Sequence, residues 1–293
     1  MDRIVEIIRA DTAHRYDYYG KNIGIAVFDT GIYPHEDFGN RIVGFVDLVG
    51  GRMNPYDDNG HGTHVAGIIG GDGKTSLGRY CGIASKCNLI GVKILDYKGT
   101  GNTDRVMRAM EWVIANKIKL NIKIINFSMG MGTDACYQDK TNIMDAVEYA
   151  WNSGIVVVCA AGNNGPGRGT VTIPGSCRKI ITVGSMDDEK NVKGIQVDYS
   201  GRGPTENCVR KPEIVAPGTS IISCSNSRFG YTTKSGTSMA TPVVSGCLAL
   251  LLEKYPHLTP AEVKLKLYQK AVKLKLDVNH QGWGMIDVEK LLF

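Results

Sequence analysis

A serine that could serve as a nucleophile lies in residues 236–242, which read GTSMATP. Gly236 lets the backbone bend sharply just before a long apolar run with helical character. Ser238 is therefore expected in the first turn of a helix, where free backbone N–H groups and the positive end of the helix dipole favour a developing oxyanion. A serine in this place is more often a simple N-cap, so the segment alone does not establish catalysis.

A carboxylate and an imidazole occur upstream, in segments that could meet this serine. The apolar run at residues 25–28 stops at Asp29, so this carboxylate is expected at the end of a buried strand. His61 follows a turn-forming DDNG segment and opens another apolar stretch, with His64 expected further along the same helix. A metal-binding pair of histidines is disfavoured, because no glutamate or third ligand lies nearby in the sequence.

These segments resemble the motifs of the subtilisin-type serine proteases. DTG begins at Asp29, HGTHVAG begins at His61, and Ser238 lies within GTSMATP. The chain order Asp, His, Ser is also the order found in subtilisin. A fourth match, AAGN at residues 160–163, falls where that family keeps its oxyanion asparagine. The resemblance extends from about residue 20 to the end of the chain.

The resemblance implies a role for each of four side chains. His61 would act as the general base toward Ser238, and Asp29 would hold the other ring nitrogen and stabilise the imidazolium. Asn163 would donate its side-chain N–H to the tetrahedral oxyanion, together with the backbone N–H of Ser238. In an unrelated chain, the Asn-Asn-Gly sequence at residues 163–165 would be only a turn.

The expected function is that of a serine endopeptidase that hydrolyses peptide bonds in extended polypeptide substrates. The sequence leaves two alternatives open: a catalytically silent scaffold that only binds peptides, and a dedicated processing protease for one cellular target. Competent residues fill all four catalytic positions, which disfavours the scaffold. Nothing in the sequence separates processing of one target from general turnover.

Substrate binding is predicted from the same resemblance. SMG at residues 128–130 and KGTG at residues 98–101 correspond to two edges that bind an extended peptide through backbone hydrogen bonds. The walls of the first specificity pocket correspond to residues 160–162, and its floor to Thr172, where many relatives carry glycine. A larger floor residue shortens the pocket, so a medium-sized apolar residue is expected before the scissile bond. The predicted substrate-binding residues are Gly99, Thr100, Gly101, Ser128, Met129, Gly130, Ala160, Gly162 and Thr172.

Apolar runs rich in valine and isoleucine alternate with helical patterns along the chain. Strands are predicted at residues 24–28, 88–95, 123–128, 155–160 and 180–184, and helices at residues 104–117, 142–152, 238–255 and 259–272. This alternation indicates an α/β fold, a three-layer sandwich with a central, mostly parallel sheet and helices on both faces. Sites in such sheets form beyond the carboxyl ends of the strands, where Asp29, Ser128 and Asn163 are expected.

Length and composition predict one domain. The resemblance implies that it is a peptidase domain at residues 21–293, preceded by a short N-terminal extension at residues 1–20. The formal charge is +5, but Lys and Arg are scattered along the chain, which disfavours nucleic acid as a partner. No stretch of about twenty apolar residues suggests a membrane span, and charges interrupt the first apolar run before it reaches the length of a signal peptide. These features predict a cytoplasmic protein.

The eight cysteines form no CxxC pair and no grouping typical of zinc ligands. Cys159 lies in an apolar strand and Cys247 in a helix, which is typical of small buried thiols in a reducing compartment. Cys81 and Cys87 are close enough in sequence that a disulfide between them stays open as an alternative.

The resemblance also bears on calcium. HEDF at residues 35–38 is similar to the segment that supplies a calcium-binding aspartate in many relatives. Its companion loop, residues 72–79, departs from the usual asparagine-containing pattern and adds the positive charge of Arg79. A structural calcium ion is an open expectation to which no ligand is assigned, and the expected chemistry requires no cofactor.

The segment before the catalytic domain is shorter than in many members of the family, which bears on regulation. Many relatives carry a long pro-segment that blocks the cleft, whereas about twenty residues precede the catalytic domain here. We expect residues 1–20 to pack against the body of the protein. Either the protein folds unaided, or inhibition comes from a short tail or from a separate inhibitor or propeptide-like protein.

Overall fold

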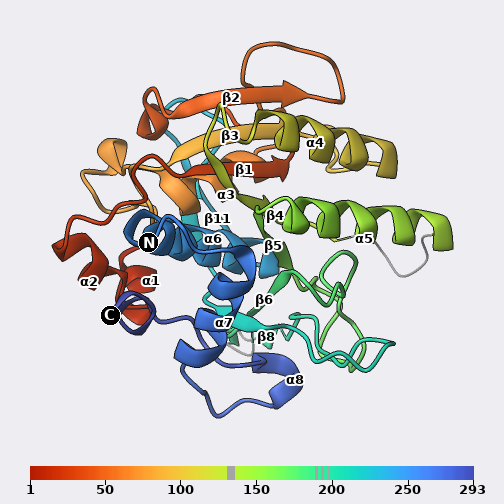
Figure 1. Cartoon of the computed structure of the whole chain (residues 1–293). Helices are drawn as coiled ribbons and strands as arrows, with labels where there is room; N and C mark the ends of the chain where they lie inside the picture. Colours follow the sequence, from red (N-terminus) through yellow and green to blue (C-terminus); the bar gives the residue numbers. More distant parts are fainter. Residues whose placement is uncertain (131–135, 189–190, 193–194, 197) are drawn as a thin grey trace.

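A seven-stranded parallel sheet forms the centre of the molecule (Figure 1). The computed structural model describes residues 1–130, 136–188, 191–192, 195–196 and 198–293 of the chain. The strand order is β2-β3-β1-β4-β5-β6-β9, and every neighbouring pair runs parallel. The strands are β1 (Gly24–Asp29), β2 (Ile42–Asp47), β3 (Asn88–Lys93), β4 (Ile122–Phe127), β5 (Val156–Ala160), β6 (Ile181–Ser185) and β9 (Ile214–Ala216).

The five strands predicted from apolar runs are confirmed. β1, β5 and β6 are buried along their whole length, because strands covered on both faces need apolar side chains on both faces. The sequence does not predict β2 and β9. β2 is a half-exposed edge strand that contains Gly44, and β9 has only 3 residues, so neither presents a long apolar run.

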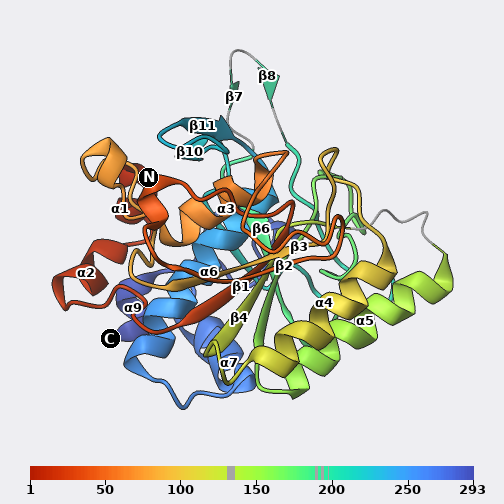
Figure 2. The ribbon, with the colours of Figure 1, turned by 90° about the horizontal axis from the view of Figure 1, so that it is seen from above.

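Helices cover both faces of the sheet, which confirms the predicted three-layer α/β architecture (Figure 2). On one side, α4 (Thr103–Asn116) packs against α5 (Tyr137–Asn152). On the other side, α3 (His61–Gly70) packs against α6 (Thr237–Lys254). α6 also contacts β4, β5 and β6 and is buried over most of its length, since its side chains are apolar on all sides.

α5 begins at Tyr137, earlier than the start at residue 142 that helical periodicity predicts. The first turn is exposed and carries no apolar stripe, and Tyr137 itself is 83% exposed. Capping holds this turn instead: the sulfur of Cys136 accepts the backbone N–H of Asp139. A periodicity argument detects a buried helix face, so it misses a turn that is held only by its cap.

Smaller elements surround this core. They are α1 (Asp2–Ile7), α2 (Ala10–Arg15), α7 (Pro260–Lys270), α8 (Val278–Gln281), α9 (Val288–Leu292), the 3-10 turns η1 (Glu36–Phe38) and η2 (Lys74–Ser76), and the two-stranded pairs of β10 (Ile221–Cys224) with β11 (Tyr231–Lys234) and of β7 (Asn191–Val192) with β8 (Ile195–Gln196).

The first residues of the chain pack against its last helix. Ile4 and Ile8 are buried within the main hydrophobic core. Arg9 forms ion pairs with Asp287 and Glu289 at the start of α9. Figure 1 shows both ends of the chain on the same side of the molecule. Residues 1–20 therefore lie against the body of the protein, as expected.

The structure also describes the state of the cysteines and the character of the helices. All eight cysteines lie in the described ranges and all are free thiols, so the structure contains no disulfide between Cys81 and Cys87. Cys159 and Cys247 are fully buried, and burial raises the pKa of both thiols. Within the part of the chain that the structure describes, no helix has both the length and the apolar character needed to cross a bilayer.

Candidate active site

Three predicted site residues lie at the carboxyl ends of neighbouring strands. Asp29 ends β1, Ser128 directly follows β4, and Asn163 lies in the loop after β5. β4 lies between β1 and β5. Because neighbouring strands are about 4.8 Å apart, the strands that carry Asp29 and Asn163 are separated by about 10 Å. A substrate held above β4 would therefore have the acid on one side and the amide on the other.

α3 begins at His61 and brings its imidazole to a buried carboxylate. Nδ1 of His61 lies 2.8 Å from Oδ1 and 2.9 Å from Oδ2 of Asp29. The carboxylate is fully buried and also accepts the backbone N–H of Thr30. A neutral imidazole that donates its Nδ1–H to the carboxylate keeps a free lone pair on Nε2.

The same contact sets the pKa of His61. Burial by itself lowers the pKa of an imidazole, because the charged form loses its hydration. The negative charge of Asp29 and its hydrogen bond outweigh that effect, so the pKa of His61 lies above its ordinary value. The pair therefore stabilises the imidazolium, which is the form that a general base takes after it accepts a proton.

Ser238 is the second residue of α6, directly after the bend that the sequence predicts. Gly236 at that bend has a φ of 147°, and a Cβ on it would lie 3.2 Å from Nδ2 of Asn163. The side chain of Ser238 is half-buried and lines a hollow together with Asn163 and Thr172. Over the described ranges it makes no hydrogen bond to His61, and such contacts often tighten only when substrate binds.

The amide of Asn163 is oriented by the residue before the candidate nucleophile. Its Oδ1 accepts the backbone N–H of Thr237 at 3.0 Å and the hydroxyl of Thr237 at 3.1 Å. With the amide oxygen engaged by two donors, the amide nitrogen is the group left to donate to a ligand. Sequence reasoning missed Thr237, since its motif position shows only that it precedes Ser238.

The two predicted peptide-binding edges face each other across a cleft. Its walls include residues from both edges, namely Gly99, Gly101, Met129 and Gly130. Thr100 has less to offer a ligand, because its backbone N–H and C=O already form hydrogen bonds with Asp96 within the same turn. Ser128 is buried, and its hydroxyl accepts a hydrogen bond from the side chain of Asn126. On the side of residues 99–101, the cleft is therefore lined mainly by glycine backbone.

Thr172 fills the space between the walls of the predicted specificity pocket. A Cβ on Gly130 would lie 2.1 Å from Oγ1 of Thr172, and a Cβ on Gly162 would lie 2.6 Å from the same oxygen. Ala160 lines the same hollow. The side chain of Thr172 therefore occupies room that these two glycines leave, and the pocket is shorter than it would be with glycine at this position.

His64 lies one turn further along α3 and has a structural role. Its ring is fully buried, and Nε2 bonds to the backbone C=O groups of Ile221 at 3.1 Å and Thr232 at 3.2 Å. Burial lowers the pKa of His64 to about 3. The ring therefore stays neutral and ties α3 to the pair of strands β10 and β11.

The residues around Asp37 do not fit the calcium site that the resemblance suggests. The carboxylate of Asp37 is fully buried and accepts hydrogen bonds from the backbone N–H and hydroxyl of Thr75 and from the phenol of Tyr231. Burial acts to raise the pKa of Asp37, but these hydrogen bonds outweigh burial and hold the pKa below its ordinary value. Calcium requires oxygen ligands with free lone pairs, and four donors, with the thiol of Cys224 as the fourth, already occupy those of Asp37.

His35 and Cys224 lie close enough to Asp37 to form a metal-binding cluster by distance alone. However, both ring nitrogens of His35 already form hydrogen bonds. Nδ1 accepts the backbone N–H of Asp37, and Nε2 bonds to the C=O of Gly230. Burial also raises the pKa of the Cys224 thiol, which disfavours the thiolate that a metal needs. The group is a hydrogen-bonded anchor for neighbouring loops.

The chain is similar in sequence to known proteins. The chain matches the model of the subtilase family over residues 20–284. Serine protease AprX of Bacillus subtilis strain 168 is 43% identical over 291 residues, which cover 92% of this chain and 66% of AprX. Subtilisin DY of Bacillus licheniformis is 35% identical over 289 residues, which cover 97% of this chain and 96% of that protein.

Solved structures show the same likeness. Sphericase superimposes with a TM-score of 0.79 and 31% identity, and the match covers 92% of each chain. A cold adapted subtilisin-like serine proteinase superimposes with a TM-score of 0.74 and 33% identity, over 92% of this chain and 89% of that one.

Proposed function

This chain belongs to the subtilase family of serine endopeptidases, and we propose that Asp29, His61 and Ser238 are its catalytic triad and Asn163 its oxyanion donor. The observation that carries the assignment is the contact of Nδ1 of His61 with both carboxylate oxygens of Asp29, at 2.8 and 2.9 Å. This contact fixes the imidazole tautomer in which Nε2 is the base, as activation of a serine hydroxyl requires.

In the proposed reaction, Nε2 of His61 takes the hydroxyl proton of Ser238 while the serine oxygen attacks the carbonyl carbon of the scissile bond. Asp29 stays ionised and stabilises the imidazolium. His61 then gives the proton to the leaving amine, and an acyl-enzyme remains. A water molecule attacks that ester with His61 again as base, which releases the carboxylic acid and restores the serine.

The tetrahedral intermediates place a negative charge on the former carbonyl oxygen. Asn163 and the backbone N–H of Ser238 are the proposed donors to this oxygen. Thr237 supports the role of Asn163, because it holds the amide oxygen and so keeps the amide nitrogen in place before substrate arrives. In subtilisin, loss of one such donor costs about 2.7–4 kcal/mol of transition-state stabilisation.

A small fluorophosphonate probe tests the assignment, because it reacts with a serine that a neighbouring base activates. We expect one label per chain, located by mass spectrometry in the peptide that contains Ser238. Heat-denatured protein is the matched control and should take up no label. Casein hydrolysis by a protein that is labelled on another serine, or on none, would contradict the proposed nucleophile.

The proposed substrate is an extended polypeptide that lies between the edges at residues 99–101 and 128–130, with a medium-sized apolar residue before the scissile bond. Thr172 supports this preference because its side chain lies between Gly130 and Gly162. Processing of one target and general turnover would use this same site.

Thr172→Gly is expected to deepen the specificity pocket and change the preferred substrate. The ratio of kcat/KM for phenylalanine over valine before the scissile bond should rise by about 10-fold or more, since a single methylene group is worth about 1–3 kcal/mol in a hydrophobic pocket. Peptide substrates that differ only at this residue measure the ratio. Thr172→Ser, which removes only the methyl group, should give an intermediate ratio. An unchanged ratio in Thr172→Gly would place the floor of the pocket elsewhere.

We also propose that the protein works in the cytoplasm and that a separate inhibitor or propeptide-like protein restrains it. The eight free thiols support a reducing compartment. The packing of residues 1–20 against the body supports a separate inhibitor. These residues already contact the core and the region of α9, so they are not free to fill the cleft. Recovery of the native protein from the medium instead of the cell lysate would contradict the location, and a large gain in activity after removal of residues 1–9 would contradict the separate inhibitor.

A further inference from the structure

We infer that Lys93 is a positioning residue for the proposed triad: its buried ammonium group holds the segment that carries Asp29 against the segment that leads into His61. Lys93 ends β3 and lies directly beside Asp29 in the sheet register. Its side chain is fully buried, so its charge must be satisfied inside the protein. The inference rests on the proposed function and extends it to a residue outside the family motifs quoted above.

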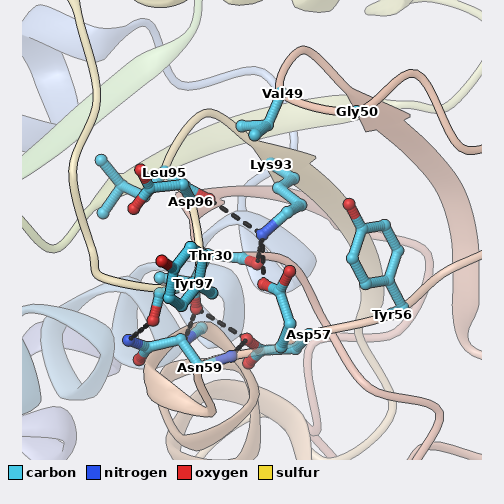
Figure 3. A network of polar contacts seen from close by, with 12 residues as sticks. Thr30, Val49, Gly50, Tyr56, Asp57, Asn59, Lys93, Leu95, Asp96 and Tyr97 are labelled. Atoms are coloured by element: carbon cyan, nitrogen blue, oxygen red, sulfur yellow. Dashed lines mark hydrogen bonds and ion pairs between the residues drawn. The ribbon is translucent and has the colours of Figure 1, made fainter.

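The ammonium group uses all three of its protons, and Figure 3 shows it at the centre of a polar network. Nζ of Lys93 donates to the C=O of Thr30 at 2.6 Å, to Oδ1 of Asp58 at 2.7 Å and to the C=O of Leu95 at 2.9 Å. The ring of Tyr56 lies beside it, with its centroid 5.1 Å from Nζ, within the range of a cation–π contact.

Each acceptor belongs to a segment with a part in the proposed site. Thr30 follows Asp29, and its backbone N–H donates to the Asp29 carboxylate at 2.8 Å. Asp58 lies in the turn that leads into His61. Leu95 precedes the peptide-binding edge, and its backbone N–H bonds to the C=O of Asp29 at 3.2 Å. The ammonium group of Lys93 therefore links three segments: the residue after Asp29, the turn before His61, and the segment before the peptide-binding edge.

A second carboxylate in the same turn repeats the connection between acid and base. Asp57 accepts the hydroxyl of Thr30 at 2.9 Å, and it accepts the backbone N–H and hydroxyl of Thr63 at 2.9 and 2.6 Å. The hydroxyl of Thr30 in turn accepts the backbone N–H of Gly62 at 3.0 Å. Thr63 and Gly62 lie in the first turn of α3 beside His61, so α3 is tied to the end of β1 independently of the His61 ring.

A role in positioning explains this lysine better than a role in stability. Burying an ammonium group removes its hydration, and apolar side chains of similar size often stabilise a fold as well as a buried ion pair does. Catalysis, in contrast, depends on geometry: a displacement of about 1 Å can lower a rate by about 100-fold. We therefore expect the loss of Lys93 to lower the catalytic rate of each folded molecule.

Lys93→Met keeps a long, unbranched side chain but removes the charge and all three hydrogen bonds. We expect the rate constant for labelling of Ser238 by a small fluorophosphonate to fall by about 10- to 100-fold, with one label per chain still reached. The value of kcat for a short peptide should fall by a similar factor, and KM should stay within about threefold. The probe does not need the peptide-binding edges, so its rate reports the triad alone.

Asp58→Ala tests the same link from its exposed end. The Asp58 side chain is 42% exposed, so this variant is expected to fold even if Lys93→Met does not. Its labelling rate should fall by about 3- to 10-fold. Asp104→Ala is the matched control, because it removes an exposed carboxylate from an ion pair with Arg108 on α4, outside the network, and should label like the parent protein.

An unchanged labelling rate per active site in folded Lys93→Met, or in Asp58→Ala if Lys93→Met does not fold, would overturn the inference. A rise in KM with unchanged labelling would also overturn it, because the network would then serve only the peptide-binding edge. Failure of the proposed function has a different signature, since the parent protein itself would then take up no label at Ser238.

Discussion

Ser238→Ala is expected to lower kcat for peptide hydrolysis by about six orders of magnitude, the loss known from removal of the nucleophile in subtilisin. Without the hydroxyl, no acyl-enzyme forms, and only the weak effects of binding and oxyanion stabilisation remain. The fold should be unaffected, because Ser238 is half-buried and its hydroxyl makes no hydrogen bond within the described ranges. A peptide assay and a thermal unfolding curve on the same preparation measure both effects.

Ser153→Ala is the matched control for this prediction. Ser153 is a half-buried serine that follows α5, at the opposite end of β5 from Asn163. The same loss of one hydroxyl at that place should leave kcat and KM unchanged. If Ser238→Ala protein hydrolysed casein at the parental rate, Ser238 would not be the nucleophile, and the proposed triad would be wrong.

The geometry around Asp29 and His61 could be anticipated from the sequence for a simple physical reason. Each residue directly adjoins an apolar run, so each lies where a buried element begins or ends. Parallel strands end at one edge of a sheet, and residues at those ends converge there whatever the details of the loops. The contact of 2.8 Å between these two side chains agrees with that argument.

The partners of the buried lysines could not be anticipated in the same way. A lysine is usually exposed, yet Lys93 and Lys211 are fully buried. Nζ of Lys211 lies 2.8 Å from a carboxylate oxygen of Glu213, and Lys264 from α7 lies 3.0 Å from the same oxygen. Thr30 and Asp58 likewise reach Lys93 only after β1 and β3 have paired in register. Sequence patterns show periodicity along one segment, whereas these contacts join distant segments.

The surroundings of Asp37 could not be anticipated for a related reason. The sequence shows a carboxylate in the segment where calcium was an open expectation, but it does not show which groups surround that carboxylate. In the structure, Tyr231 comes from β11, far along the chain, and donates to Asp37 at 2.6 Å. A hydroxyl donor in that position occupies the carboxylate lone pair that a cation would need.

Asp29→Asn is expected to lower kcat by about four orders of magnitude, as the corresponding change does in other enzymes with this triad. The amide can hold the imidazole in the wrong tautomer, with its proton on Nε2, and it cannot stabilise the imidazolium. The variant should still fold, because asparagine has nearly the same size and can accept the backbone N–H of Thr30 that Asp29 accepts.

The pH dependence of Asp29→Asn separates a loss of charge from a loss of structure. In the parent protein, Asp29 holds the pKa of His61 above its ordinary value, and only the neutral imidazole above that pKa acts as base. The neutral amide of the variant would leave burial as the main influence, and burial lowers the pKa, so the rising limb of kcat/KM against pH should move to lower pH while the plateau falls. Asp104→Asn, at an exposed carboxylate, should change neither the plateau nor the limb. If the rising limb of the Asp29→Asn profile stayed in place or moved to higher pH, another group would be setting the pKa of His61, and the charge of Asp29 would not be what prepares this imidazole to accept the serine proton.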